Sequence, residues 1–581
     1  MRIQFVAPTS HLTNHRLLFR RLAFVPALFC APFAPAAEVL VETGSSGMVV
    51  SGHPEATAAG VAVLKAGGNA IDAAIAVSLA LGVAEPYGSG LGGKLVLVYY
   101  DAKLQRVFSV DGLDRASFGL VVPVALALPA EARSNGWTSA CIPGLAAGLW
   151  QAQQRWGSRP WAQNIQPAID LARAGFTVLP KTRDLFAEQE KKLRAGDPDL
   201  ARIYLPGGNL PEVGSRLVSE DLARTLESLA ANGVDGFYRG PIGQAIAAAS
   251  VKGGGSITIE DLKRARAFIG EASEIDFNGY SLAGAPPPCT GAALFMTVLK
   301  VVEGAQWHDL SLRAAENIDQ LGRAWRVVQP LVQSRIADSM GARNSFQQLV
   351  SPRNIESLRR QLANPPLPAA DPAAPTVAAF FDEPELAFAS TTHFVIADAQ
   401  GNIVSATQSL SHHFGAGVVA PGTGVVMNNT MSNFSYGDPT SLNYVAPGKR
   451  PRSTIAPTII FKDRRPFLAL GLPGAGRIPT AMLHVLADTL VFKRPLADAI
   501  ADTRFHFYNP TKAGEPDAVE AEESLPDDVV AALKERGWSV ELKEPAGTGR
   551  FFGGFNAIQF NADGTKTGLA DQRRTNAAAG Y

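Results

Sequence analysis

Residues 389–409, ASTTHFVIADAQGNIVSATQS, are the most informative segment of this 581-residue sequence. Two strand-like runs flank a turn-forming centre rich in Asp, Gly and Asn, a pattern typical of a β-hairpin. If the hairpin centres on Gln400, Thr391 faces Ser409. This pairing places two hydroxyl groups on opposed strands with Cβ atoms about 5 Å apart. A bulge at Gly401 would shift the pairing by one residue.

A threonine hydroxyl is a weak nucleophile unless a base accepts its proton. Cleavage of the chain between Ser390 and Thr391 would create such a base on the same residue, because a new α-amine has a pKa of about 7.7–8. Ser409 would then hold the Thr391 hydroxyl in line. Taken alone, the pattern also fits an ordinary strand rich in Ser and Thr, since Thr is common in strands.

The flanking sequence predicts a mixture of helices and strands. Residues 55–66 have apolar residues at helical spacing and end at Gly67-Gly68, and Asn69 is suited to cap a second helix over 70–83. Further helices are predicted over 220–231, 242–250, 290–303 and 478–492, strands over 95–101 and 106–110, and an exposed connector rich in Pro and Ala over 364–375.

Other functional motifs are absent or out of context. GSGLGG (88–93) matches G-x-G-x-x-G, but it follows a helix and precedes a strand, the reverse of a dinucleotide site, so it predicts a tight turn. His412 and His413 are adjacent on a strand and point to opposite faces. His393 is interpreted as a structural histidine, and no zinc-type cluster is found in the sequence. No cofactor and no metal are expected.

Composition narrows the class of protein. Hydrophobic residues make up 46% and charged residues 18%, which indicates a globular chain. Lys+Arg and Asp+Glu are both 53, so charge gives no reason to expect nucleic acid or an anionic membrane as a partner. Cys141 and Cys289, in apolar or turn-like contexts, are expected to be free buried thiols.

The N-terminus is typical of a secretory signal. Arg20 and Arg21 precede an apolar run over 22–33, and Ala-Pro-Ala at 34–36 fits the small-x-small cleavage pattern. The run is too short to span a bilayer, which needs about 20 apolar residues. We expect residues 1–37 to be removed, leaving a soluble periplasmic or secreted protein without a membrane segment.

Seven segments, in order along nearly all of the mature chain, resemble motifs of the γ-glutamyltranspeptidases. These are GVAVLKAGGNAIDAAIAVSLALGVAE (60–85), GLGG (90–93), AGAPPPCTG (283–291), TTHF (391–394), MNNTMSNFS (427–435), KRPRST (449–454) and GLPGAGR (471–477). The resemblance implies an α+β fold, the four-layer αββα sandwich of the N-terminal-nucleophile hydrolases. It also implies self-cleavage into a large subunit, 38–390, and a small catalytic subunit, 391–581, which remain together as a heterodimer.

The same resemblance implies roles by position. Thr391 would be nucleophile and base, and Ser409 replaces a Thr that hydrogen-bonds the nucleophile. Gly474 and Ala475 match two glycines whose N–H groups form the oxyanion hole. Ala475 keeps its N–H group, but its Cβ is strained if the site needs φ > 0. Ser453 and Thr454 match a Ser-Ser pair that contacts the substrate carboxylate.

The sequence departs from the family where a glutamyl carboxylate would bind. The family has an Arg two residues after an Asp, and here Leu113 takes that place after Asp111. Arg115 lies two residues further, on the same face of a strand but displaced by about 7 Å. Compensation for Leu113 by Arg115 is therefore one hypothesis.

A second group of departures concerns the substrate ammonium. Asn433 replaces the acidic residue expected there, Thr430 replaces Gln and Ser411 replaces Asn. Loss of the acid removes the charge that pairs with an ammonium. Arg452 adds a positive charge where Leu is usual, so the pocket suits an acyl group without a free α-amine, and one that is anionic. The loop over 434–447 is short, which favours an open site.

Two enzyme hypotheses and one hypothesis of another class follow. The first is an amidohydrolase or acyltransferase acting on γ-glutamyl or related small-molecule amides, with water or an amine as acceptor. The second is an acylase similar to cephalosporin or glutaryl acylases or to oxamate amidohydrolases, without γ-glutamyl specificity. The third is a non-catalytic periplasmic binding protein, against which the retained Thr391, Ser409 and Gly474 argue.

Overall fold

The computed structural model describes residues 37–307, 311–363, 389–508, 516–544 and 551–581. Residues 35–581 belong to one compact unit. The predicted signal segment, 1–37, lies outside the described residues except for residue 37. The predicted connector, 364–375, lies entirely outside them.

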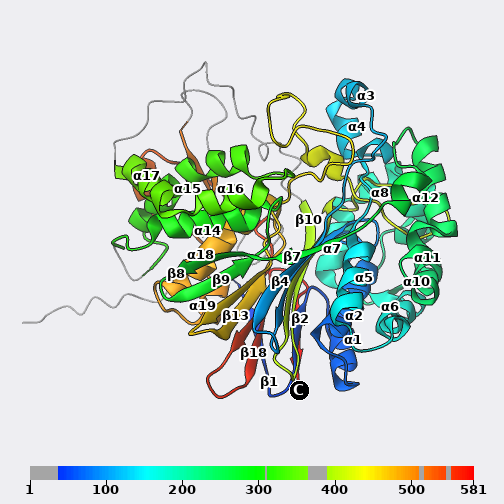
Figure 1. Ribbon diagram of the computed structural model, residues 1–581, viewed down its shortest axis with the longest axis horizontal. Coiled ribbons are helices and arrows are strands. Elements are labelled where there is room, and N and C mark those ends of the chain that lie inside the picture. Colours follow the sequence, from blue (N-terminus) through cyan, green and yellow to red (C-terminus); the bar gives the residue numbers. More distant parts are fainter. Residues whose placement is uncertain (1–36, 308–310, 364–388, 509–515, 545–550) are drawn as a thin grey trace, which may run out of the picture. The chain divides into compact units, whose positions relative to one another are not determined.

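Two seven-stranded sheets form the two inner layers (Figure 1). The first sheet contains the hairpin of residues 389–412. The other strands of this sheet lie on both sides of the hairpin, and all neighbouring strands pair in antiparallel ladders. In spatial order its strands are β19 (Ala577–Gly580), β2 (Met48–Ser51), β10 (Ala389–Ala397), β11 (Ile403–His412), β3 (Lys94–Asp101), β4 (Arg106–Gly112) and β7 (Phe268–Glu271).

The second sheet is also antiparallel throughout. In spatial order its strands are β1 (Val39–Gly44), β18 (Lys566–Asp571), β17 (Asn556–Phe560), β13 (Arg465–Gly471), β12 (Thr458–Lys462), β9 (Tyr280–Gly284) and β8 (Ser273–Phe277). Smaller sheets join β14 (Phe505–Tyr508), β15 (Ala518–Glu522) and β16 (Ser539–Glu544), and β5 (Phe176–Thr177) with β6 (Arg216–Leu217).

One helical layer covers the hairpin sheet, where α2 contacts β10 and β11 and α5 contacts β3 and β4. The main helices are α1 (Pro54–Lys65), α2 (Ala70–Ala84), α5 (Leu145–Trp156), α6 (Trp161–Ala174) and α10 (Glu220–Asn232). The other helices on this side are α3 (Val122–Ala127), α4 (Ala130–Ser134), α7 (Pro180–Glu188), α8 (Glu190–Ala195), α9 (Pro198–Tyr204), α11 (Asp235–Tyr238), α12 (Pro241–Lys252) and α13 (Ile259–Lys263).

The other helical layer packs on the second sheet, and their apolar side chains share one buried cluster. Its helices are α14 (Thr290–Val302), α15 (Ala315–Arg335), α16 (Ala342–Leu349), α17 (Pro352–Ala363), α18 (Ile478–Leu490), α19 (Leu496–Ala501) and α20 (Asp527–Glu535). Figure 1 shows the two helical layers on opposite sides of the paired sheets. The expected αββα sandwich is therefore confirmed.

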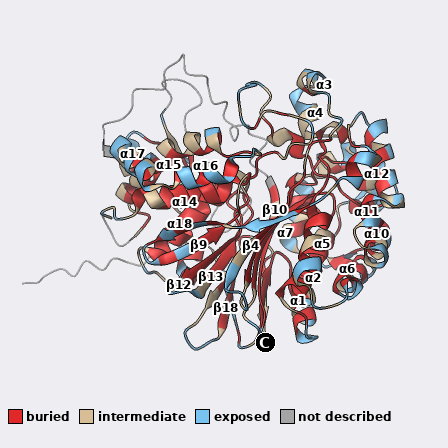
Figure 2. Ribbon diagram, viewed as in Figure 1, coloured by how far each residue is buried: buried red, intermediate tan, exposed pale blue. Residues whose placement is uncertain are grey.

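The two sheets bury a third apolar cluster between them (Figure 2). Val395 of β10, Ile403 of β11 and Ile459 of β12 are fully buried there. The opposite face of β10 turns Phe394 and Ile396 toward the helical layer that contains α2. Burial on both faces explains why the strand is continuously apolar after residue 393.

The hairpin turn is held by one aspartate. Asp398 Oδ1 accepts hydrogen bonds from the backbone N–H groups of Gln400 and Asn402, both at 2.9 Å. Its Oδ2 accepts from the N–H of Ala70 at 2.9 Å, at the start of α2. Asn69 caps that helix in a capping box, as the sequence predicts. The turn of the hairpin and the N-terminus of α2 are thus fixed to each other.

Two cysteines and a charged cluster complete the interior. Cys141 and Cys289 are free and buried, as expected.

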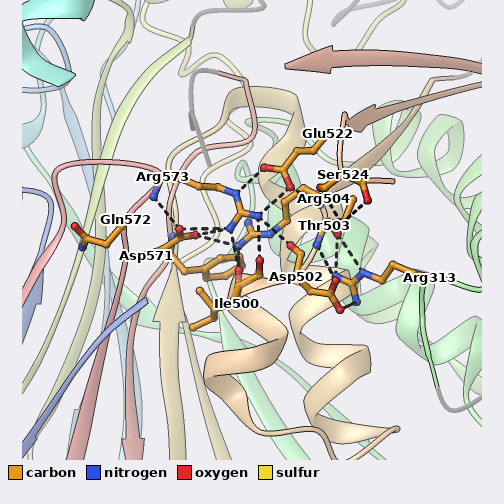
Figure 3. Close-up of polar contacts among 12 residues, drawn as sticks. Arg313, Ile500, Asp502, Thr503, Arg504, Glu522, Ser524, Asp571, Gln572 and Arg573 are labelled. Atoms are coloured by element: carbon orange, nitrogen blue, oxygen red, sulfur yellow. Dashed lines mark hydrogen bonds and ion pairs between the residues drawn. The ribbon is translucent and has the colours of Figure 1, made fainter. Parts of the chain in front are cut away.

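A fully buried ionic cluster consists of Arg504, Glu522, Asp571 and Arg573 (Figure 3). Arg573 contacts Glu522 at 2.6 Å, and Arg504 contacts Asp571 at 3.0 Å. The cluster joins the ends of β15 and β18 to α19.

Candidate active site

Thr391 lies on a bulge in β10. Residues 392–397 pair with 403–408 in the register expected for a hairpin centred on Gln400. The pairing shifts between Ser390 and Thr392, so that Ser390 pairs with Ser411. The bulge therefore sits at Thr391 and not at Gly401. A bulge bends the strand and re-aims the side chain of the extra residue.

The expected contact between the two hydroxyl groups is present. Thr391 Oγ1 lies 3.0 Å from Ser409 Oγ. Both hydroxyl groups donate to the carbonyl oxygen of Ser390, Thr391 Oγ1 at 2.5 Å. The N–H of Ser411 donates to Ser409 Oγ at 2.9 Å, and Ser390 Oγ donates to the carbonyl of Tyr87. The Ser390–Thr391 peptide is thus held between two hydroxyl groups.

The glycine turn at 88–93 supports this site from behind. It joins α2 to β3, as expected for a structural turn. A Cβ at Gly93 would lie 2.3 Å from the carbonyl oxygen of Ser409, and one at Gly92 would lie 2.0 Å from that of Val426. Only glycine allows these close backbone approaches. The motif therefore lets the backbone of the turn pack closely against β11 and against residue Val426.

A cavity lies next to Thr391. Residues from both expected subunits, 38–390 and 391–581, line it. Seven of the expected site residues line it: Thr391, Ser409, Ser411, Asn433, Ser453, Thr454 and Ala475. Eight further lining residues are Lys94, Thr290, Gln333, His412, Ser432, Arg452, Ile455 and Gly476.

Three expected residues do not line the cavity. Thr430 lies behind it, with its hydroxyl 2.9 Å from Ser411 Oγ. Gly474 precedes the lining residue Ala475. Arg115 points elsewhere: its guanidinium donates to the carbonyl of Gly448 at 3.2 Å and lies over the ring of Phe268. Leu113 is buried and apolar. The geometry gives no support to the hypothesis that Arg115 replaces the arginine that the family has at the Leu113 position.

Gly474 and Ala475 both have positive φ, at 146° and 53°. They lie just before α18 in the turn that begins with Gly471. The left-handed conformation costs a residue with a Cβ about 1–2 kcal/mol. The strain foreseen for Ala475 is therefore present in the backbone of the cavity wall.

Lys94 is a cavity residue that sequence reasoning missed. It pairs with Ser409 in the β3–β11 ladder and is 98% buried. Its ammonium donates to Ser411 Oγ at 2.7 Å and to Thr430 Oγ1 at 3.2 Å, and it lies 3.8 Å from Asp114 Oδ2. The available signal was a lysine between a glycine turn and the continuous apolar run of residues 95–100.

Arg452 is the second cation in the cavity wall. Its Nε donates to the carbonyl of Ile336 at 2.7 Å. Its Nη2 is buried without a hydrogen-bond partner among the residues that the structure describes. Burial lowers the pKa of this guanidinium to about 10, so it stays charged near neutral pH.

The histidines nearby are unsuited to act as a base at neutral pH. His412 lines the cavity, and burial together with repulsion from Lys192 and Lys94 lowers its pKa to about 3. Burial lowers the pKa of His393 to about 3 as well, and its Nδ1 lies 2.8 Å from Thr407 Oγ1. His393 packs against Gly471, as expected of a structural histidine.

Two features are absent from the described parts of the chain. No three His, Cys, Asp or Glu side chains gather there in a way that could hold a metal ion. No helix in those parts has the length and apolarity needed to cross a bilayer.

Sequence comparison adds relatives along nearly the full chain. The family model described as gamma-glutamyltranspeptidase matches residues 56–581. The Acylase ACY 1 proenzyme of Pseudomonas sp. (strain V22) is 35% identical over 539 residues, which cover 91% of this chain and 92% of the relative. The Glutathione hydrolase proenzyme of Bacillus subtilis (strain 168) is 31% identical over 557 residues, covering 93% and 92%.

Structure comparison agrees. The crystal structure of cephalosporin acylase from Bacillus halodurans superposes with a TM-score of 0.81 at 27% identity, covering 96% of this chain and 99% of that one. The hairpin that contains Thr391, the paired sheets and the ordered motifs therefore have one explanation: this chain is an enzyme of the γ-glutamyltranspeptidase family, with the N-terminal-nucleophile hydrolase fold.

Proposed function

We propose that this enzyme hydrolyses small-molecule amides, or transfers their acyl groups to amines, through an acyl ester on Thr391. The observation that carries the proposal is the contact between Thr391 Oγ1 and Ser409 Oγ at the Ser390 carbonyl, beside a cavity. A nucleophile, the bond it first breaks and a substrate cavity thus meet at one point.

The first step is self-cleavage. Thr391 Oγ1 attacks the carbonyl carbon of Ser390, and Ser409 Oγ stabilises the negative charge on the carbonyl oxygen. The Ser390–Thr391 peptide bond breaks, the Thr391 nitrogen takes the proton, and an ester forms. Water hydrolyses this ester to give a carboxylate on Ser390 and a free hydroxyl and amine on Thr391. The products are a large subunit, 38–390, and a small subunit, 391–581.

Turnover then uses the new α-amine. The amine accepts the proton of Thr391 Oγ1 as this oxygen attacks the substrate carbonyl carbon. The N–H groups of Gly474 and Ala475 stabilise the oxyanion, a contribution worth about 10²–10³ in rate in comparable sites. The substrate amine leaves with the proton, and water or a second amine releases the acyl group. Ser453 and Thr454 bind the acyl group from the cavity wall.

The acyl specificity that we propose is that of an acylase and not strict γ-glutamyl transfer. Leu113 is apolar, Arg115 contacts Gly448 outside the cavity, and Asn433 is neutral where an ammonium would need an acid. Ser411 and Thr430 surround Lys94 instead of an α-amine. The resemblance to a relative named as an acylase points in the same direction.

We also propose that the mature enzyme acts outside the cytoplasm, in the periplasm or secreted. The support is the arginine pair and short apolar run before Ala-Pro-Ala at 34–36. N-terminal sequencing of the large subunit from a secreting host is expected to begin near residue 38. A large subunit that retains residue 1 would contradict this placement.

Activity is tested with chromogenic amides. Processed wild-type enzyme is expected to release p-nitroaniline from glutaryl-p-nitroanilide faster than from γ-glutamyl-p-nitroanilide, and Thr391→Ala is expected to release none. Thr391→Ser keeps the hydroxyl and is expected to retain part of the activity. Turnover that survives in Thr391→Ala, or a fully processed enzyme inactive on both amides, would contradict the proposal.

A further inference from the structure

The charges of the cavity wall are all of one sign. Among its fifteen lining residues, Lys94 and Arg452 are cationic and none is Asp or Glu. His412 is neutral because burial and nearby cations lower its pKa to about 3. A groove elsewhere differs in this respect, because the guanidinium groups of Arg106 and Arg343 that line it both contact Glu271.

Lys94 lines the cavity, whereas the carboxylate that balances its charge does not. Asp114 lies 3.8 Å from Lys94 Nζ, is itself 99% buried, and is not among the lining residues. Its Oδ2 accepts from Thr430 Oγ1 at 2.6 Å, so Asp114 is held on the far side of Thr430 and Lys94. A ligand in the cavity therefore meets the cation and the hydroxyl of Ser411.

Arg452 has no counter-charge at all among the described residues. Its Nε uses the carbonyl of Ile336, while Nη2 is buried and unpartnered in a side chain that is 91% buried. Burying such a donor unpaired is unfavourable, more so for a charged group. A guanidinium presents paired donors that match the two oxygens of a carboxylate.

We propose that Lys94 and Arg452 determine the specificity of the cavity, which takes acyl groups that end in a carboxylate and rejects those that also carry an ammonium. This rests on the proposed acyl transfer to Thr391. Arg452 supplies donors to the carboxylate. Lys94 lies beside Ser411 and repels a second cation there. Asn433 is neutral, so it supplies no negative charge to pair with a substrate ammonium. Monoamides of short dicarboxylic acids are the substrate class that fits.

Binding is tested without any need for turnover. Three amides with the same five-carbon chain carry different charged groups: glutaramate has a carboxylate, L-glutamine has a carboxylate and an ammonium, and pentanamide has neither. Each is titrated against processed enzyme while the melting temperature is recorded. Glutaramate is expected to reach half-saturation at a concentration at least ~10-fold lower than the other two. Equal or tighter binding of pentanamide or L-glutamine would overturn the proposal.

Variants separate the contributions of the two cations. Each variant is described by two ratios of kcat/KM, glutaryl to pentanoyl and glutaryl to γ-glutamyl, measured on one preparation. Such ratios do not depend on the fraction of the protein that is folded. Arg452→Met is expected to lower kcat/KM for glutaryl-p-nitroanilide by about 10- to 100-fold, with pentanoyl-p-nitroanilide changed less than about 3-fold. Arg452→Lys keeps the charge and is expected to fall between. The Lys94→Met/Asp114→Asn pair removes both buried charges and is expected to lower the glutaryl to γ-glutamyl ratio at least ~10-fold.

Lys449→Met is the matched control. Lys449 lies in the same segment as Arg452 but donates to the carbonyl of Tyr444 outside the cavity, so both ratios should stay at the wild-type value. If both ratios also stay unchanged in the Arg452 and Lys94 variants while Thr391→Ala is inactive, the specificity assignment is wrong and acyl transfer stands. If Thr391→Ala remains active, the acyl-Thr391 mechanism fails while the binding order still reports on the two cations.

Discussion

Thr391 Oγ1 and Ser409 Oγ lie 3.0 Å apart across β10 and β11, and both hydroxyl groups contact the carbonyl oxygen of Ser390. The bulge at Thr391 makes this possible, because it turns the Thr391 side chain out of the regular ladder and toward the preceding peptide. We propose that the same pair of hydroxyl groups acts in self-cleavage and in turnover.

Removal of the Ser409 hydroxyl is expected to slow self-cleavage more than it destabilises the fold. Ser409→Ala loses a donor to the Ser390 carbonyl, and losing one such donor costs about 10²–10³ in rate. Ser409→Thr keeps the hydroxyl and should restore cleavage. The appearance of two chains on a denaturing gel over time measures this. Wild-type cleavage kinetics in Ser409→Ala would show that Ser409 has no such role.

The pH dependence of turnover is expected to follow the Thr391 α-amine and not a histidine. An α-amine has a pKa of about 7.7–8, so kcat/KM should fall about 10-fold per pH unit well below that value. His393 has a pKa lowered to about 3 by burial, so His393→Gln should leave the position of this limb unchanged. A limb that moves in His393→Gln would assign the base to His393.

Acid stability is expected to depend on the same buried histidine. Because the pKa of His393 is about 3 in the folded state and about 6.5 unfolded, the unfolded chain binds a proton that the folded chain excludes. The contribution of His393 to stability is therefore complete above about pH 6.5 and falls by about 1.4 kcal/mol per pH unit below it.

Chemical denaturation at several pH values between 4.5 and 7.5 tests this slope. His393→Gln should show a slope shallower than wild type by about one proton below pH 6, whatever its absolute stability. His53 has a pKa lowered to about 4 by burial and should add to the wild-type slope in the same sense. Identical slopes in wild type and His393→Gln would contradict the account.

Removal of one arginine from the buried ionic cluster of Figure 3 is expected to destabilise the fold strongly. Arg573 contacts Glu522 at 2.6 Å, and both are completely buried with Arg504 and Asp571. Arg573→Met leaves the buried Glu522 carboxylate without its ion-pair partner and should cost about 3–5 kcal/mol. Arg239→Met, at an exposed pair with Asp235, should cost less than about 1 kcal/mol. Melting temperatures of the two variants compare them directly.

Much of this architecture could be predicted from local signals. Asn69 and the glycines at 67 and 68 marked the boundary between α1 and α2. The turn around Gln400 predicted the hairpin register, because Asp398 bonds the backbone of its own turn. The glycine motif at 88–93 was recognised as a structural turn from the order of its flanking elements.

The remainder depended on distant contacts that no local pattern encodes. The bulge at Thr391 interrupts the ladder near the start of β10, whereas Gly401 lies in the turn that follows the other end of this strand. Lys94 begins an apolar strand, where a lysine is ordinarily exposed, and its burial is visible only once Asp114, Ser411 and Thr430 surround it. The direction of Arg115 likewise follows from its contact with Gly448.

Intact mass combined with N-terminal sequencing of the purified protein tests the central claim most directly. We expect two chains, with the smaller one beginning at Thr391 and ending at Tyr581, and a single uncut chain for Thr391→Ala. An active preparation that remains one uncut chain, or a small subunit that begins at any other residue, would contradict the mechanism.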